Sequence, residues 1–165
     1  MNKPCIITLT TDFGLKDPYV GMMKGVILSI NPEARIIDIS HQVEAGTVSH
    51  AAGLIQETCI FFPKGTIHMG VVDPGVGSDR RPILIRTEDH FFIGPDNGLF
   101  WPIIKSNDHV EIIHLNKDEY FLPRVSHTFH GRDIFAPVAA HLSRGINPLK
   151  MGTIIIPDIR LSPPG

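Results

Sequence analysis

The sequence of 165 residues lacks the features that mark several large classes of protein. Its 15 Lys and Arg are nearly balanced by 17 Asp and Glu, so the net charge of −2 leaves no basic surplus for nucleic acid or an acidic membrane. No apolar run approaches the ~20 residues that span a bilayer, and the N-terminal apolar stretch is too short for a signal peptide. We therefore expect neither a nucleic-acid-binding protein nor a membrane protein.

Cysteine is also scarce, with only Cys5 and Cys59 present. Two cysteines make neither a disulfide framework nor a zinc site, so we expect a reducing, cytoplasmic location. The apolar fraction of 42% and the charged fraction of 19% are those of an ordinary globular domain. This balance excludes a mainly disordered chain, and the sequence holds neither an internal repeat nor a low-complexity tract.

The first half of the chain alternates strand and helix patterns. Runs of β-branched and apolar residues predict buried strands at residues 4–11, 35–40 and 66–72. Apolar residues at helical spacing predict helices between these strands, over 18–30 with Asp17 as N-cap and over 48–59. This β-α-β-α-β order predicts an α/β fold with a parallel-rich central sheet.

The second half has a mixed pattern. Three further strands are predicted at residues 82–86, 90–93 and 110–115, the first two as a hairpin. Residues 95–98 (PDNG) are a turn signal, and helical spacing returns from Ile134 to Leu142 with Gly145 as a C-cap. The tail is a short apolar run followed by a proline-rich end, which is typical of the start of a linker.

Charged residues fall at one edge of the predicted sheet. Asp12 and Asp73 each follow the carboxyl end of a strand, and His130 lies just before the last helix. Open parallel sheets bind their ligands at the carboxyl ends of the strands. The sequence therefore predicts two carboxylates and one imidazole on a single rim.

Each of these residues also has a plain structural interpretation. Asp12 fits an Asx turn, and the glycine and proline residues around Asp73 in VVDPGVG favour a turn as well. His130 suits a cap for the following helix. Arg80 and Arg81 come after a loop, where a pair of arginines is ordinarily a pair of surface charges.

The histidines allow one further hypothesis. His127 and His130 are spaced i, i+3 and, with Asp73 and Asp133, suggest a metal-dependent hydrolase, although the HExxH pattern is absent. The glycine-rich GVGSDRR segment lacks the GK[ST] of a phosphate-binding loop. Structural or surface roles are expected for His41, His50, His68 and His141.

Six motifs occur in a fixed order along the chain: LTTDFG (9–14), YVGMMKGVI (19–27), ISH (39–41), VVDPGVGSDRR (71–81), GPDNGLF (94–100) and TFHGRDIFAP (128–137). Together they closely resemble the S-adenosylmethionine (SAM) hydrolase family, the adenosine-forming SAM hydroxide adenosyltransferases, which are relatives of the fluorinase and chlorinase. The resemblance covers about residues 4–152. It implies the N-terminal domain of that family, an α/β fold whose parallel-rich central sheet carries helices on both faces.

The resemblance also implies roles for individual residues. Asp73, Arg80 and His130 match the set that holds the attacking water. Asp12 matches the residue that binds the ribose hydroxyls of SAM. The region of the sulfonium and C5′ would be lined by Thr128, Phe129 and Gly131, with Val76 close by. The halogenating relatives have a tyrosine in place of Asp73 and a serine in place of Gly131, so the resemblance implies water as the nucleophile.

The implied reaction is hydrolysis of SAM to adenosine and L-methionine, with SAM as substrate and neither cofactor nor metal. The resemblance further implies a C-terminal β-barrel domain and a homotrimer, which are usual in this family. On this basis residues 1–152 are expected to be the N-terminal domain, and residues 153–165 the start of a linker to a barrel domain absent from this sequence. The alternative is a catalytically silent module that binds SAM or adenosine or supports oligomerisation.

Overall fold

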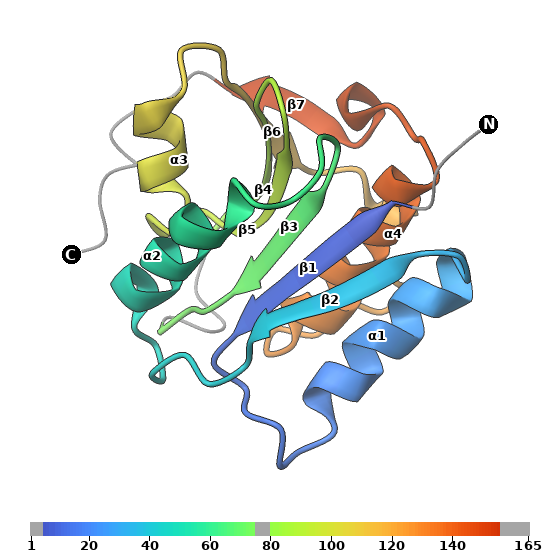
Figure 1. Ribbon diagram of the computed structural model, residues 1–165. Coiled ribbons are helices and arrows are strands. Elements are labelled where there is room, and N and C mark those ends of the chain that lie inside the picture. The colour runs from blue at the N-terminus through green and yellow to red at the C-terminus, as the bar shows by residue number, and fades with distance from the viewer. Residues whose placement is uncertain (1–4, 75–79, 156–165) are drawn as a thin grey trace.

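The computed structural model describes residues 5–74 and 80–155, which form a seven-stranded sheet with helices on both faces (Figure 1). The strands are β1 (Ile6–Thr11), β2 (Arg35–Ser40), β3 (Ile67–Val71), β4 (Pro82–Arg86), β5 (Phe91–Pro95), β6 (Glu111–Leu115) and β7 (Gly152–Ile155). They are arranged in the order β2-β1-β3-β5-β4-β6-β7. The predicted α/β fold class is confirmed.

Strand direction divides the sheet into two parts. β1 pairs in parallel with β2 and β3, and β3 pairs in parallel with β5. β4 lies between β5 and β6 and is antiparallel to both, and β7 is antiparallel to β6. Because β4 runs against β5, it begins at the edge of the sheet where β1, β3 and β5 end.

The helices are α1 (Tyr19–Ile30), α2 (Val48–Cys59), α3 (Trp101–Ser106) and α4 (Ala136–Ser143). A π-helical turn (Gly131–Phe135) leads into α4, and 3₁₀ turns lie at Asp118–Tyr120 and Pro148–Lys150. α1 and α4 pack together on one face of the sheet, while α2 and α3 cover the other (Figure 1). In the part of the chain that the structure describes, no helix is long and apolar enough to cross a membrane.

Each face of the sheet has its own apolar core, because successive strand side chains point to opposite sides. Leu84 of β4 joins the core beneath α1 and α4, which includes the fully buried Met23. Its neighbours Ile83 and Ile85 join the core beneath α2 and α3, which includes Ile55. A single strand thus contributes to both cores.

Two helix starts differ from the prediction. α1 begins at Tyr19 with Pro18 at the cap position, and no side chain makes a capping hydrogen bond, so the predicted N-cap role of Asp17 is wrong. The last helical segment starts at Gly131, three residues before the predicted Ile134, because a π-helical turn precedes α4.

One α-helix and one strand have no counterpart in the prediction. α3 is a six-residue helix that begins three residues after the predicted turn, and it is too short to show helical periodicity. Residues 153–155, which the prediction assigns to a linker, belong to β7 and pair with β6. The remainder of that predicted linker, 156–165, lies outside the described residues.

Gly94 of β5 sits where the neighbouring backbone and the side chain of Phe100 approach closely. A Cβ atom at this position would lie 2.5 Å from the Gly70 carbonyl oxygen of β3 and 3.0 Å from Cζ of Phe100.

We expect Gly94→Ala to lower the free energy of unfolding by about 1–3 kcal/mol, measured by urea denaturation. Gly53→Ala is the control, because nothing lies within 4 Å of its added Cβ on the exposed side of α2. This control should raise the same free energy by about 0.5–1 kcal/mol, and equal effects would contradict the packing argument.

His68 of β3 is buried near the opposite end of the strand. Its Nδ1 lies 2.8 Å from Oγ1 of Thr8, and its ring stacks on Phe92 with centroids 5.2 Å apart. The ring of His90 meets it edge-on at 5.0 Å. Burial, with a smaller contribution from the charge of His90, lowers the pKa of His68 from 6.5 to about 3. The structural role expected for this residue agrees with its position.

The lowered pKa of His68 makes stability depend on pH. Between about pH 3 and pH 6.5 the unfolded chain binds a proton that the folded chain does not. The contribution of His68 to the free energy of unfolding is therefore fully present above this window, and it is lost as the pH is lowered through the window. This one group makes the free energy of unfolding change by up to about 1.4 kcal/mol per pH unit. Urea denaturation between pH 4 and pH 7 should show a flatter dependence in His68→Gln. Titration of the folded His68 ring near pH 6.5 by NMR would contradict this assignment.

Candidate functional site

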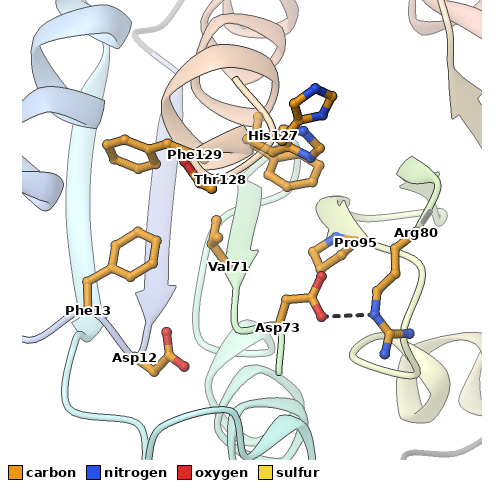
Figure 2. Close-up of a pocket in the computed structure, with 12 residues that line it drawn as sticks. Asp12, Phe13, Val71, Asp73, Arg80, Pro95, His127, Thr128 and Phe129 are labelled. Atoms are coloured by element: carbon orange, nitrogen blue, oxygen red, sulfur yellow. Dashed lines mark ion pairs between the residues drawn. The ribbon is translucent and has the colours of Figure 1, made fainter. Parts of the chain in front are cut away.

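A pocket opens at the edge of the sheet where β1, β3 and β5 end and β4 begins (Figure 2). It contains about 620 Å³ of empty space that opens to solvent. Its lining residues are Asp12, Phe13, Val71, Asp73, Arg80, Pro95, His127, Thr128, Phe129, His130, Gly131 and Phe135. Segments far apart in the sequence therefore meet at one place.

Most residues that the sequence singled out lie in this pocket. The predicted rim of two carboxylates and one imidazole is confirmed, because Asp12, Asp73 and His130 all line it. The other predicted site residues that do so are Arg80, Thr128, Phe129 and Gly131. Val76 lies outside the described residues. The individual catalytic and binding roles stay predictions.

Asp73 and Arg80 form an ion pair in the pocket, with Arg80 Nε 2.9 Å from Asp73 Oδ1 (Figure 2). Asp73 comes two residues after β3 and Arg80 two residues before β4, so strand direction brings them to the same edge. Their side chains are 15% and 35% exposed. The carboxylate is thus held beside a cation while the pocket stays accessible to a ligand.

Asp12 does not form the local Asx turn that was one interpretation of it. Its Oδ2 accepts a hydrogen bond from Gly46 N at 2.7 Å, which ties the end of β1 to the loop before α2. The local turn bond belongs instead to Thr11, whose Oγ1 accepts from Phe13 N at 3.2 Å. Figure 2 shows the Asp12 carboxylate directed toward the pocket.

A chain of polar contacts that runs from the exposed Asp38 to the buried His41 and Thr11 supports the backbone around Asp12. His41 Nε2 lies 2.7 Å from Asp38 Oδ1, and its Nδ1 lies 2.7 Å from Thr11 Oγ1. Since a carboxylate only accepts, Nε2 carries the proton that it donates to Asp38. Burial opposes the charge of Asp38, but hydrogen bonds from Lys24 and His41 outweigh it and lower the pKa of Asp38. His41 is structural, as expected.

One wall of the pocket is aromatic. Phe13 and Phe129 meet edge to face with centroids 5.8 Å apart, and Tyr19 packs against both rings. The guanidinium of Arg132 covers Phe129 at 4.9 Å from the ring centroid. Such a wall gives a ligand apolar contact and π faces that favour a positively charged group.

Asp133 shapes the segment that carries Thr128 and His130. It is fully buried, and its carboxylate accepts from Ser126 N at 2.8 Å and from Arg132 Nε at 2.7 Å. Burial opposes ionisation, yet these hydrogen bonds outweigh it and hold the pKa of Asp133 below its ordinary value. His130 occupies the N-cap position of the π-helical turn, as the capping interpretation expects, but its side chain makes no capping hydrogen bond.

The metal hypothesis requires Asp73, His127, His130 and Asp133 to converge. The first three line the pocket, but Asp133 does not, and its carboxylate is engaged by Ser126 and Arg132. Within residues 5–74 and 80–155, no group of three or more His, Cys, Asp or Glu side chains is arranged to hold a metal ion.

Sequence reasoning missed several features of the site. Arg81 is not a surface charge: its side chain is 16% exposed, and Nη2 lies 2.8 Å from Oδ2 of the buried Asp96. Phe13 and Pro95 line the pocket but were not singled out as site residues. Their positions beside the ends of β1 and β5 are the signal that points to them.

Comparison with known sequences identifies relatives over most of the chain. The family model of the SAM hydroxide adenosyltransferase N-terminal domain matches residues 7–152. The chain is 43% identical to an (R)-S-adenosyl-L-methionine hydrolase of Methanocaldococcus jannaschii, over 83% of this chain and 52% of that protein. It is 38% identical to a protein of the same name from Salinispora arenicola, over 96% of this chain and 61% of that protein. A fluorinase of Nocardia brasiliensis is 26% identical over 93% of this chain and 59% of that protein.

Solved structures show the same fold. A conserved protein from Thermotoga maritima superposes with a TM-score of 0.89 at 42% identity, over 92% of this chain and 59% of that one. A conserved protein from Thermus thermophilus gives a TM-score of 0.77 at 32% identity, with the same coverage of 92% and 59%. The chain thus spans about half to three-fifths of the length of these relatives.

The buried carboxylate of Asp133 generates a stability prediction. Asp133→Ala leaves Ser126 N–H without its acceptor and should lower the free energy of unfolding by about 1–3 kcal/mol at pH 7. Because the folded pKa is lowered, the charged form stabilises above about pH 4, and the difference from wild type should shrink as the pH falls below that. Asp108→Ala, at an exposed turn, is the control and should change stability by less than about 0.5 kcal/mol in urea denaturation. A loss for Asp133→Ala no larger than that of the control would refute the role assigned to Asp133.

Proposed function

The chain belongs to the family of the SAM hydroxide adenosyltransferase N-terminal domain, and we propose that it hydrolyses SAM to adenosine and L-methionine. The observation that carries the proposal is the meeting of the Asp73–Arg80 ion pair with His130 in one pocket at the edge of the sheet. The names of its relatives, (R)-S-adenosyl-L-methionine hydrolases, support SAM as the substrate.

The proposed reaction is an in-line displacement at C5′ of the ribose. A bond forms between the water oxygen and C5′ as the bond between C5′ and sulfur breaks, and its electron pair goes to the sulfur. The sulfonium becomes the neutral thioether of methionine, and the water loses one proton. Since bulk water has a pKa of about 15.7, the site must orient the water and accept this proton.

The three pocket residues suit these tasks. Asp73 would accept a hydrogen bond from the water, and the Arg80 guanidinium at 2.9 Å would fix the carboxylate and stabilise hydroxide character. His130 would orient the water or take its proton as a general base. Holding water and C5′ in line supplies a further large part of the acceleration.

The remaining pocket residues would bind SAM. The carboxylate of Asp12, anchored by Gly46 N–H, would accept hydrogen bonds from the ribose hydroxyls. Thr128, Phe129 and Gly131 would contact the sulfonium and C5′ region, where the aromatic wall favours a cation. Val76 is proposed near the same region.

Several wider properties belong to the proposal as well. The reaction as written needs neither a cofactor nor a metal. SAM is the proposed partner, with no nucleic acid or membrane, and the enzyme is proposed to be a cytoplasmic homotrimer. A C-terminal β-barrel domain, as in the family that the sequence resembles, would complete the binding of SAM.

Single substitutions test the catalytic set. We expect Asp73→Asn, Arg80→Met and His130→Ala each to lower kcat for adenosine formation by about 10²–10⁴-fold, because each removes a group that orients or deprotonates the water. Adenosine is measured by chromatography after incubation of the protein with SAM. Asp89→Asn is the matched control, since Asp89 is an exposed partner of Lys64 and is not part of the pocket lining. Wild-type turnover in any of the three would remove that residue from the mechanism.

The same assay separates the alternatives. Binding of SAM or adenosine without product would favour a silent binding module over a hydrolase. Turnover that disappears after exhaustive chelation and returns with added metal would favour a metal-dependent reaction. We expect adenosine to form at an unchanged rate after chelation, because the described carboxylates and imidazoles do not converge on a metal site.

A further inference from the structure

Asn97 lies in the turn after β5 and contacts the end of the neighbouring strand β3. Its Nδ2 donates to the carbonyl oxygen of Val72 at 2.9 Å, and Val72, which is fully buried, directly precedes Asp73. Its Oδ1 accepts from Leu99 N at 3.1 Å. This bond sets the orientation of the side-chain amide, so that Nδ2 is the atom directed at Val72. The backbone leading into Asp73 is therefore held by a side chain outside the pocket.

Asp96, the preceding residue, holds the segment that carries Arg80. Its Oδ2 accepts from Nε and Nη2 of Arg81 at 3.0 and 2.8 Å, and its backbone N–H donates to the Arg81 carbonyl oxygen at 2.9 Å. Arg81 directly follows Arg80. The Asp96 side chain is only 4% exposed, so this charged contact is shielded from water and geometrically restrained.

The strand order explains how one turn reaches both segments. β5 lies between β3, whose end leads to Asp73, and β4, whose start follows Arg80. We propose that the turn at residues 95–98 positions the Asp73–Arg80 ion pair, with Asn97 and Asp96 as positioning residues for catalysis. Neither residue lines the pocket, so Asn97 acts through Val72 and Asp96 acts through Arg81. The catalytic consequence rests on the proposed function, whereas the positioning itself is a property of the fold.

Asn97→Asp tests the inference most directly. It replaces the donor Nδ2 by an oxygen but retains an acceptor for Leu99 N. We expect kcat for adenosine formation to fall about 10- to 100-fold, because a small misplacement of a catalytic group is costly. KM should stay within about threefold, since the pocket keeps its lining. The matched control is Asn107→Asp, which removes a similar bond to Ile103 O at 2.7 Å, at the end of α3, and should leave kcat within about twofold.

A second readout does not depend on turnover. The Nε–Hε resonance of Arg80 in a ¹⁵N–¹H NMR spectrum reports on the ion pair with Asp73. It should shift in Asn97→Asp and stay in place in Asn107→Asp. Should thermal unfolding show that Asn97→Asp does not fold, Asn97→Ser is the milder variant and should show the same shift, because its shorter side chain does not reach Val72.

The outcomes separate the inference from the proposed function. An Arg80 resonance that shifts only in the Asn97 variants, with a fall in kcat, supports it. Wild-type kcat in a folded Asn97 variant, or an unchanged Arg80 resonance, overturns it. Absence of adenosine from the wild-type protein would refute the proposed function, and the Arg80 resonance then decides the positioning inference alone.

Discussion

The direction of β4 is the constraint on which the site depends. β1, β3 and β5 run together and end at one edge of the sheet, whereas β4 runs against β5 and begins there. This reversal places Arg80, just before β4, next to Asp73, just after β3. A parallel β4 would begin at the opposite edge and separate the two charges by the length of a strand. The ion pair therefore depends on sheet topology as well as on the short separation of the two residues in the sequence.

Behind the pocket, polar groups outside its lining hold the residues that line it. Asp38 and His41 support the turn that carries Asp12, and Asp133 supports the segment that carries His130. Each hydrogen bond is made in a setting from which water is partly or wholly excluded, where such bonds are strong and their loss is costly. The pocket is thus preorganised by its surroundings, which is what positioned catalytic groups require.

The fold and much of the site could be predicted from the sequence because both follow from local patterns. Strand periodicity located the ends of β1 and β3, and the rule for parallel sheets then placed Asp12 and Asp73 on one rim. The features that were missed depend on tertiary contacts. The pairing of Arg81 with Asp96 requires knowledge that β4 and β5 are neighbours, and the π-helical turn at Gly131–Phe135 has no periodic signature. Asp96, Asn97 and Asp133 lie in motifs that the sequence displays, but a motif does not show which neighbouring segment each side chain contacts.

The pocket is lined by segments that come from the beginning, the middle and the end of the described chain. No partly folded form that lacks one of these segments retains a complete binding surface. A ligand there is consequently linked to the folding equilibrium of the whole domain rather than to one loop. At a free concentration of 100 times its Kd, such a ligand would add about 2.7 kcal/mol to the stability of the folded state. Ligand binding at this site and folding of the domain are therefore linked equilibria.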